Sequence, residues 1–86
     1  MRERPISALP NLGPKTAEWL AEVGITTEAE LRAIGPVAAW QRLKAAQPDV
    51  ITVNALYALH GAVTNQHWAS LPPELRALLR KDAGVE

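Results

Sequence analysis

The sequence contains no cysteine, no phenylalanine and only one tyrosine. Without cysteine the chain has no disulfide, no thiolate nucleophile and no thiolate ligand for a metal ion. The scarcity of aromatic residues leaves a core built mainly from leucine and alanine, which are also strong helix formers. β-Branched residues are sparse and scattered, so composition favours helices over strands. We therefore expect an all-α protein, and the lack of cysteine fits a reducing cytoplasm.

Two further absences narrow the class of protein. No apolar run is long enough for a signal peptide or a membrane span, so we expect a cytoplasmic protein without a membrane partner. The chain also has no excess of either charge, with nine basic and nine acidic residues. Proteins that hold nucleic acid mainly by neutralising phosphates are usually basic. The balance argues against strong, general binding of nucleic acid but leaves room for a small local phosphate contact.

The apolar fraction of 48 % over 86 residues is enough for one folded domain. Proline and glycine divide this domain into short segments with helical periodicity. Helices are expected over residues 15–23, 28–34, 36–46 and 53–63, and from Pro73 onward. Small and apolar residues cover nearly the whole circumference of the segment 53–63, which predicts a central helix enclosed by the others.

Local signals support two of these helices. Thr27 and Glu30 have the spacing of a capping box, and Glu28 lies four residues before Arg32 in the orientation of a favourable ion pair. The last helix should be amphipathic, with an apolar stripe of Leu75, Leu78 and Leu79 opposite Arg76, Arg80 and Lys81. We expect about five short helices in a small orthogonal bundle of helix-hairpin-helix or SAM-like type. The domain should span residues 6–82, between tails at 1–5 and 83–86.

The segment Leu-Pro-Asn-Leu-Gly-Pro-Lys at residues 9–15 has the pattern of a helix-hairpin-helix turn. Asn11 and Gly13 tolerate the unusual backbone of a tight turn, and Pro14 suits the first position of a helix. Leu12 between them should insert into the core. Such a turn leaves backbone N–H groups at a helix N-terminus, where the helix dipole also favours an anion such as phosphate.

The candidate phosphate-binding residues surround this turn: Arg4, Asn11, Gly13, Lys15 and Thr16. An ammonium at Lys15 and a hydroxyl at Thr16 would stand where they can reach a phosphate oxygen. The commonest form of the turn has glycine in place of Asn11, and an asparagine side chain can hinder the approach of a DNA backbone. These residues support a structural role for the hairpin and a phosphate-binding role about equally.

Trp19 is the candidate residue for a protein interface, because other residues of its helix already define the inner face. An exposed tryptophan is a common interface anchor, and packing in the core is the alternative. The two histidines, His60 and His67, lack the spacing of a helical metal pair. No arrangement of nucleophile, base and carboxylate is evident either. We therefore expect no metal, no cofactor, no small-molecule substrate and no enzymatic activity.

Several stretches resemble the C-terminal domain of TfoX/Sxy-type competence regulators. These are residues 6–25, 30–44 and 54–62, and His67-Trp68 followed by 71–75, so that the similarity covers about residues 6–79. The resemblance implies a helical, helix-hairpin-helix-like domain of a bacterial protein linked to DNA transformation and transcription regulation. In that family the domain often follows a separate N-terminal α/β domain, which is absent here. We expect either a stand-alone protein or an excised domain.

Two functions stay open at this point. The resemblance implies a weak, sequence-independent and salt-sensitive contact between the hairpin and the DNA backbone. The zero net charge favours instead a module for protein–protein interaction, which would form a homodimer or dock on a partner without touching nucleic acid.

Overall fold

The computed structural model describes residues 5–9 and 11–85 and confirms an all-α fold. The α-helices in chain order are α1 (Pro14–Glu22), α2 (Glu28–Ile34), α3 (Pro36–Ala46), α4 (Val53–Thr64) and α5 (Pro73–Ala83). Two 3-10 turns, η1 (Ile6–Ala8) and η2 (Trp68–Ser70), precede α1 and α5. An isolated antiparallel bridge joins Pro5 to Thr27 and ties the start of the described chain to the start of α2.

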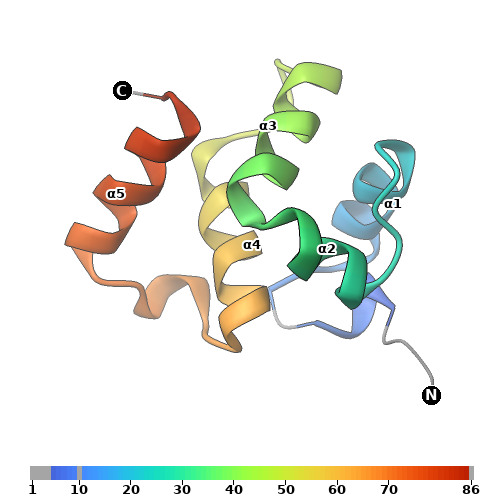
Figure 1. The fold of residues 1–86 in the computed structure, drawn as a ribbon, viewed down its shortest axis with the longest axis horizontal. Helices are drawn as coiled ribbons and strands as arrows, with labels where there is room; N and C mark the ends of the chain where they lie inside the picture. Colours follow the sequence, from blue (N-terminus) through green and yellow to red (C-terminus); the bar gives the residue numbers. More distant parts are fainter. Residues whose placement is uncertain (1–4, 10, 86) are drawn as a thin grey trace.

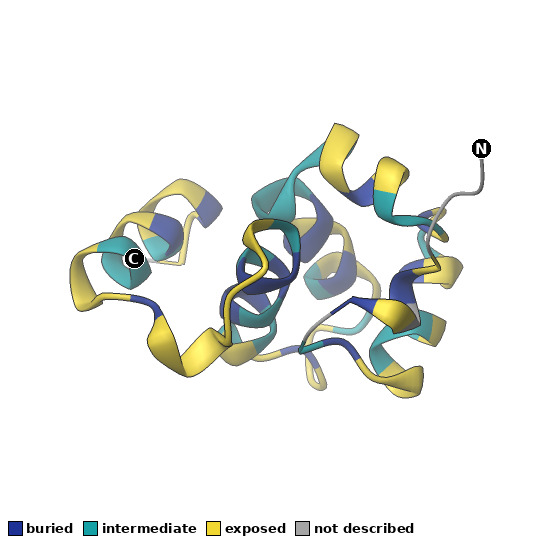
Figure 2. Ribbon diagram, turned by 90° about the horizontal axis from the view of Figure 1, so that it is seen from below, coloured by how far each residue is buried: buried dark blue, intermediate teal, exposed yellow. Residues whose placement is uncertain are grey.

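Helix α4 lies at the centre of the bundle and contacts α2, α3, α5 and η2 (Figure 1). Its side chains of Leu56 and Leu59 are fully buried, and Ala62 is nearly so. Figure 2 shows buried residues gathered where the helices meet, and an exposed stretch that runs from the end of α4 into η2. The prediction of a central helix is therefore confirmed, and it follows from the nearly continuous apolar surface of this segment.

The ends of the first two helices follow the local signals. Gly24 adopts φ +88°, which glycine tolerates without steric cost, and the amide of Ile25 then donates to the carbonyl of Leu20 at 2.9 Å. Ile25 is fully buried, so the turn returns an apolar side chain to the core. The capping box is present, because the Thr27 hydroxyl accepts from the Glu30 amide while the Glu30 carboxylate accepts from the Thr27 amide.

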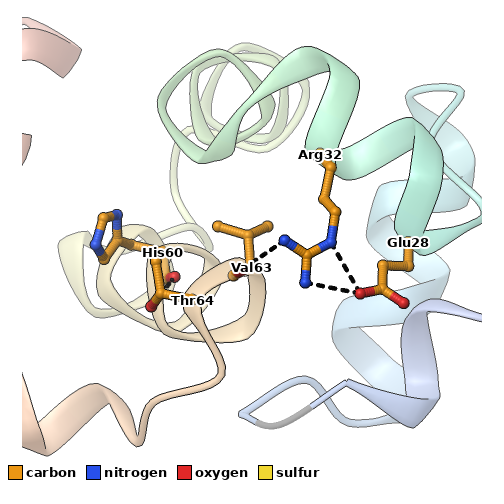
Figure 3. Close-up of polar contacts among 5 residues, drawn as sticks. All are labelled: Glu28, Arg32, His60, Val63 and Thr64. Atoms are coloured by element: carbon orange, nitrogen blue, oxygen red, sulfur yellow. Dashed lines mark hydrogen bonds and ion pairs between the residues drawn. The ribbon is translucent and has the colours of Figure 1, made fainter.

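An arginine links α2 to the end of α4 (Figure 3). Arg32 Nη1 donates to the carbonyl oxygen of Val63 at 2.7 Å, and Nη2 lies 2.8 Å from Glu28 Oε2. The predicted pair between Glu28 and Arg32 is therefore confirmed. A second role of Arg32 was not predicted. Its guanidinium donates to a carbonyl in the last turn of α4, where the helix dipole favours a positive charge.

Helix α5 departs from the prediction at one position. Leu79 is buried and Leu75 packs partly against the core, but Leu78 is 53 % exposed. The expected stripe of three leucines was wrong at Leu78, because α5 lies at the edge of the bundle and meets α3 and α4 along one narrow side (Figure 1). Arg76 on the same helix also departs from the prediction of a purely polar outer side, because its guanidinium lies over the rings of Tyr57 and Trp68.

Candidate functional site

The turn at residues 11–13, which we call the hairpin, connects η1 to α1. Asn11 adopts φ +69°, a left-handed conformation that asparagine tolerates better than most residues. Leu9 and Leu12, on either side of the turn, are each only 4 % exposed. Two buried leucines therefore anchor the turn in the core, and the prediction that Leu12 inserts there is confirmed.

Three backbone amides at the start of α1 have no acceptor among the described residues. They belong to Gly13, Lys15 and Thr16. The first helical hydrogen bond of α1 is made by the amide of Ala17, which donates to the carbonyl oxygen of Gly13 at 3.0 Å. No side chain caps this end of the helix. Gly13 and Lys15 are exposed and Thr16 is half-buried. The N-terminus of α1 therefore offers hydrogen-bond donors together with the positive end of the helix dipole.

The side chain of Asn11 is used inside the protein. Its Nδ2 donates to the carbonyl oxygen of Gln66 at 2.7 Å and reaches that of Ala58 at 3.5 Å, and its Oδ1 accepts from the amide of Trp68 at 3.3 Å. These partners lie on α4, on the loop that follows it and at the start of η2. The amide group is thus held against α4, where it satisfies backbone groups and fixes the position of the hairpin.

Gly61 makes this contact possible. It lies in α4, and a Cβ atom at this position would be 2.5 Å from Asn11 Nδ2 and 2.5 Å from the carbonyl oxygen of Gln66. A glycine inside a helix weakens it relative to alanine, so a packing reason is expected. The reason here is the room that the hairpin needs. Asn11 and Gly61 together form what we call the hairpin lock.

Lys15 is exposed, and its ammonium is directed along α1. Its Nζ lies 5.8 Å from the centre of the Trp19 ring, one helical turn further on. Glu18 and Glu22 are exposed on the same helix, so the surroundings are mixed in charge. Arg4, the remaining candidate cation, lies outside the described residues.

The three tryptophans occupy different environments. Trp40 is buried, and its indole N–H donates to the carbonyl of Thr52 at 2.9 Å. Trp19 is half-buried and packs against the edge of the core. Trp68 is 36 % exposed in η2. The partial exposure of Trp19 agrees with the expectation that it lies partly on the surface, but the sequence did not single out Trp68, which is more exposed.

The segment around Trp68 makes several contacts with its neighbours. The ring of His67 stacks on that of Trp68, with centroids 5.9 Å apart and planes at 26°. His67 Nδ1 accepts from the amide of Ala69 at 3.1 Å, which caps η2. The guanidinium of Arg76 donates to the carbonyl oxygens of Trp68, Ala69 and Leu71 at 3.1–3.2 Å. These contacts hold the backbone of η2 and the His67 ring, and the pair of rings lies at the surface.

His60 on α4 is the other histidine. It is half-buried, and burial lowers its pKa below the usual value of 6.5, because removing the ring from water disfavours the charged form. Within the described part of the chain, no three side chains of histidine, aspartate or glutamate gather where they could hold a metal ion.

An apolar groove of about 480 Å³ lies between α3 and the end of α5. Its lining residues are Trp40, Gln41, Lys44, Ala45, Val53, Ala83, Gly84 and Val85. Lys44 is the charged residue among them, and its ammonium donates to the carbonyls of Pro48 and Ile51 at 2.7 and 2.9 Å. The ammonium is therefore fixed at the groove by the loop that follows α3.

Comparison with known proteins decides the family. The sequence model of the TfoX C-terminal domain matches residues 2–83, nearly the whole chain. The chain belongs to this family. The resemblance inferred from the sequence is thus confirmed. Protein Sxy of Escherichia coli (strain K12) is 38 % identical to this TfoX C-terminal domain over 71 residues, which are 83 % of the chain and 33 % of Sxy. The chain therefore spans about a third of the length of that relative.

Two solved structures share the fold. An uncharacterized protein from Listeria monocytogenes, in a triclinic crystal form, superposes with a TM-score of 0.85 at 32 % identity, over 94 % of this chain and 91 % of the other. A protein of unknown function from Listeria monocytogenes, in a tetragonal crystal form, superposes with a TM-score of 0.83 at 33 % identity. The match covers 92 % of this chain and 96 % of the other. Across the described residues of this TfoX C-terminal domain, none of the helices is long and apolar enough to cross a membrane.

Proposed function

We propose that this TfoX C-terminal domain is a non-enzymatic part of a regulator of competence and DNA transformation, and that it contacts the phosphate backbone of DNA through its hairpin. The observation that carries the proposal is the set of amides at Gly13, Lys15 and Thr16, which have no acceptor among the described residues. Amide donors and a helix dipole at one point favour a phosphate oxygen. The regulatory role itself is supported by membership of the family.

The position of the Asn11 side chain supports this proposal. An asparagine in such a turn would hinder a DNA backbone if its side chain stood on the outer surface. Its amide group instead bonds to backbone groups of α4 and the following loop. Asn11 then acts as a positioning residue, and the donors to phosphate are the amides that follow it.

Lys15 would have to turn away from Trp19 to reach a phosphate bound at these amides. A contact between a lysine and an aromatic ring at an exposed site is worth only about 0.5–1 kcal/mol. A hydrogen bond between an ammonium and a phosphate is charge-assisted and stronger than a neutral one. The lysine can therefore exchange one partner for the other at little cost.

The test is a titration of a fluorescently labelled DNA duplex at low salt, followed by anisotropy. We expect weak binding whose dependence on salt corresponds to one or two phosphates, since log K falls with log salt by about 0.9 per phosphate. Lys15→Glu should abolish binding. Lys81→Glu is the matched control, because it changes the net charge equally at an exposed position on α5. Equal binding by wild type and Lys15→Glu would refute the proposal.

The groove between α3 and α5 favours a second candidate function, the docking of another protein. The groove is mostly apolar, and Val85 at its edge is 44 % exposed. A second copy of this chain is the occupant to test, because the chain carries as many acidic as basic residues and can supply a carboxylate to Lys44. Light scattering over a range of concentrations measures the oligomeric state.

Two variants separate the candidate interfaces. A dimer that Ala45→Arg dissociates would support the groove, since Ala45 is an exposed lining residue. A dimer that Trp19→Ala dissociates would support Trp19 as the interface anchor. A chain that stays monomeric at all concentrations would count against both.

A further inference from the structure

The stacked rings of His67 and Trp68, with Arg76 behind them, form a surface cluster that we call the aromatic platform. The platform is exposed: all residues from Thr64 to Ser70 are, and Trp68 keeps 36 % of its surface open to solvent. Large exposed aromatic side chains that are held in one orientation lose little conformational entropy when a ligand binds.

The platform also carries the positive charge of Arg76. Arg76 Cζ lies 5.9 Å from the centre of the Trp68 ring and 5.2 Å from that of Tyr57. Its hydrogen bonds go to neutral carbonyl groups, and no carboxylate among the described residues pairs with it. Partly exposed aromatic rings beside a guanidinium that no described carboxylate neutralises complement a ligand with an apolar ring and a negative charge. A nucleotide has both.

The hairpin lock brings this platform next to the hairpin. Asn11 Oδ1 accepts from the amide of Trp68 itself, at 3.3 Å. Gly13, the first residue whose amide has no acceptor among the described residues, follows two positions later, so at most about 7 Å of chain separates its Cα from that of Asn11. The backbone of Trp68 thus lies beside the hairpin, and the hairpin amides follow Asn11 within a few ångströms of chain.

We propose that the aromatic platform binds unpaired bases, so that this domain prefers single-stranded nucleic acid to a duplex. The inference rests on the proposed function, because the phosphate of the same strand would lie at the hairpin amides. Bases in a duplex are stacked on each other and cannot lie against His67 or Trp68. Bases of a single strand stack on aromatic side chains with little dependence on sequence.

The experiment compares a short oligothymidylate with an abasic strand of the same length, which has the same phosphates and no bases. We expect the wild-type domain to bind the oligothymidylate roughly tenfold more tightly, the value for one stacked base. The indole N–H resonance of Trp68 should shift with the oligothymidylate and not with the abasic strand.

Variants assign the preference to the platform. Trp68→Leu keeps an apolar side chain and should bind both strands with the weak affinity of the abasic strand, and His67→Ala should lose part of the preference. Leu78→Ala, at an exposed apolar position on α5, should behave as wild type. Circular dichroism checks that each variant is folded. If Trp68→Leu does not fold, the affinities of His67→Ala for the two strands decide whether the platform binds bases.

The outcomes separate the two proposals. If the wild type binds both strands with equal affinity and Lys15→Glu binds neither, base binding by the aromatic platform is refuted and the phosphate contact at the hairpin is supported. A preference for the oligothymidylate that survives in both platform variants would also refute base binding by the platform. Absence of binding to either strand and to the duplex would overturn both proposals and would leave the exposed rings as a contact for protein.

Discussion

Replacing Gly61 by alanine tests the hairpin lock directly. The added methyl group would lie 2.5 Å from Asn11 Nδ2 and equally close to the carbonyl oxygen of Gln66, distances that real Cβ atoms essentially never show. The carbonyl belongs to the backbone and cannot rotate aside as the end of a flexible side chain can. Either the hairpin or the loop after α4 must therefore move.

Opposing effects set the size of the change in the free energy of unfolding. Alanine stabilises a helix interior by up to about 1 kcal/mol relative to glycine. Overpacking costs about 1–3 kcal/mol, and a partly buried donor that loses its hydrogen bond costs about 1–3 kcal/mol. The unfavourable effects are larger, so we expect Gly61→Ala to destabilise the domain by about 2–4 kcal/mol.

The assay is urea unfolding followed by circular dichroism. The midpoint should fall while the slope with denaturant stays unchanged. Asn11→Gly supplies the second arm of a double-mutant cycle, because glycine keeps the positive φ and removes the side chain. Gly61→Ala should cost less in that background, since one of its two close contacts is gone. A Gly61→Ala variant as stable as wild type, or strictly additive effects of the two changes, would refute the hairpin lock.

The remaining predictions concern the helix ends and one titrating group. Arg32→Met should lower the free energy of unfolding by about 1–2 kcal/mol, because it removes a charge-assisted bond to the last turn of α4; thermal unfolding that matches wild type would contradict this. Thr27→Ala should cost about 1 kcal/mol in the same assay through loss of the capping box, and no cost would show that the cap is dispensable. The pKa of His60 should lie below 6.5 in an NMR titration. Because the unfolded chain then binds the proton first, stability is fully present above about pH 6.5 and falls as the pH drops through the folded pKa. His60→Gln should reduce that loss, and an unchanged pH profile would refute the assignment.

The helices and the turn around Asn11 could be predicted because their signals are local. Proline at a first helical position, glycine after a last one, and the capping box at Thr27 each act within a few residues. The leucines around Asn11 likewise show by their spacing that the turn must insert into the core. These signals determine where elements begin and end, but not which elements meet.

The contacts of the candidate site could not be predicted, because they join residues far apart in the chain. Asn11 bonds to Gln66 and Trp68, which follow it by 55 and 57 positions. The sequence holds one indirect signal, the glycine at position 61 inside an apolar helix, which implies that another part of the chain approaches closely. Arg76 shows the same limit: its place on the outer side of an amphipathic helix was predicted, but not its contacts with Tyr57 and Trp68.

The most direct test of the phosphate contact is a titration of the ¹⁵N-labelled domain with a short DNA strand at low salt, followed by amide chemical shifts. We expect the amides of Gly13, Lys15 and Thr16 to shift the most, because these donors gain a phosphate acceptor. We expect no such shifts in Lys15→Glu and the same shifts as in wild type in Lys81→Glu. Saturating shifts that are confined to the groove between α3 and α5, or no shifts at all, would contradict the phosphate contact.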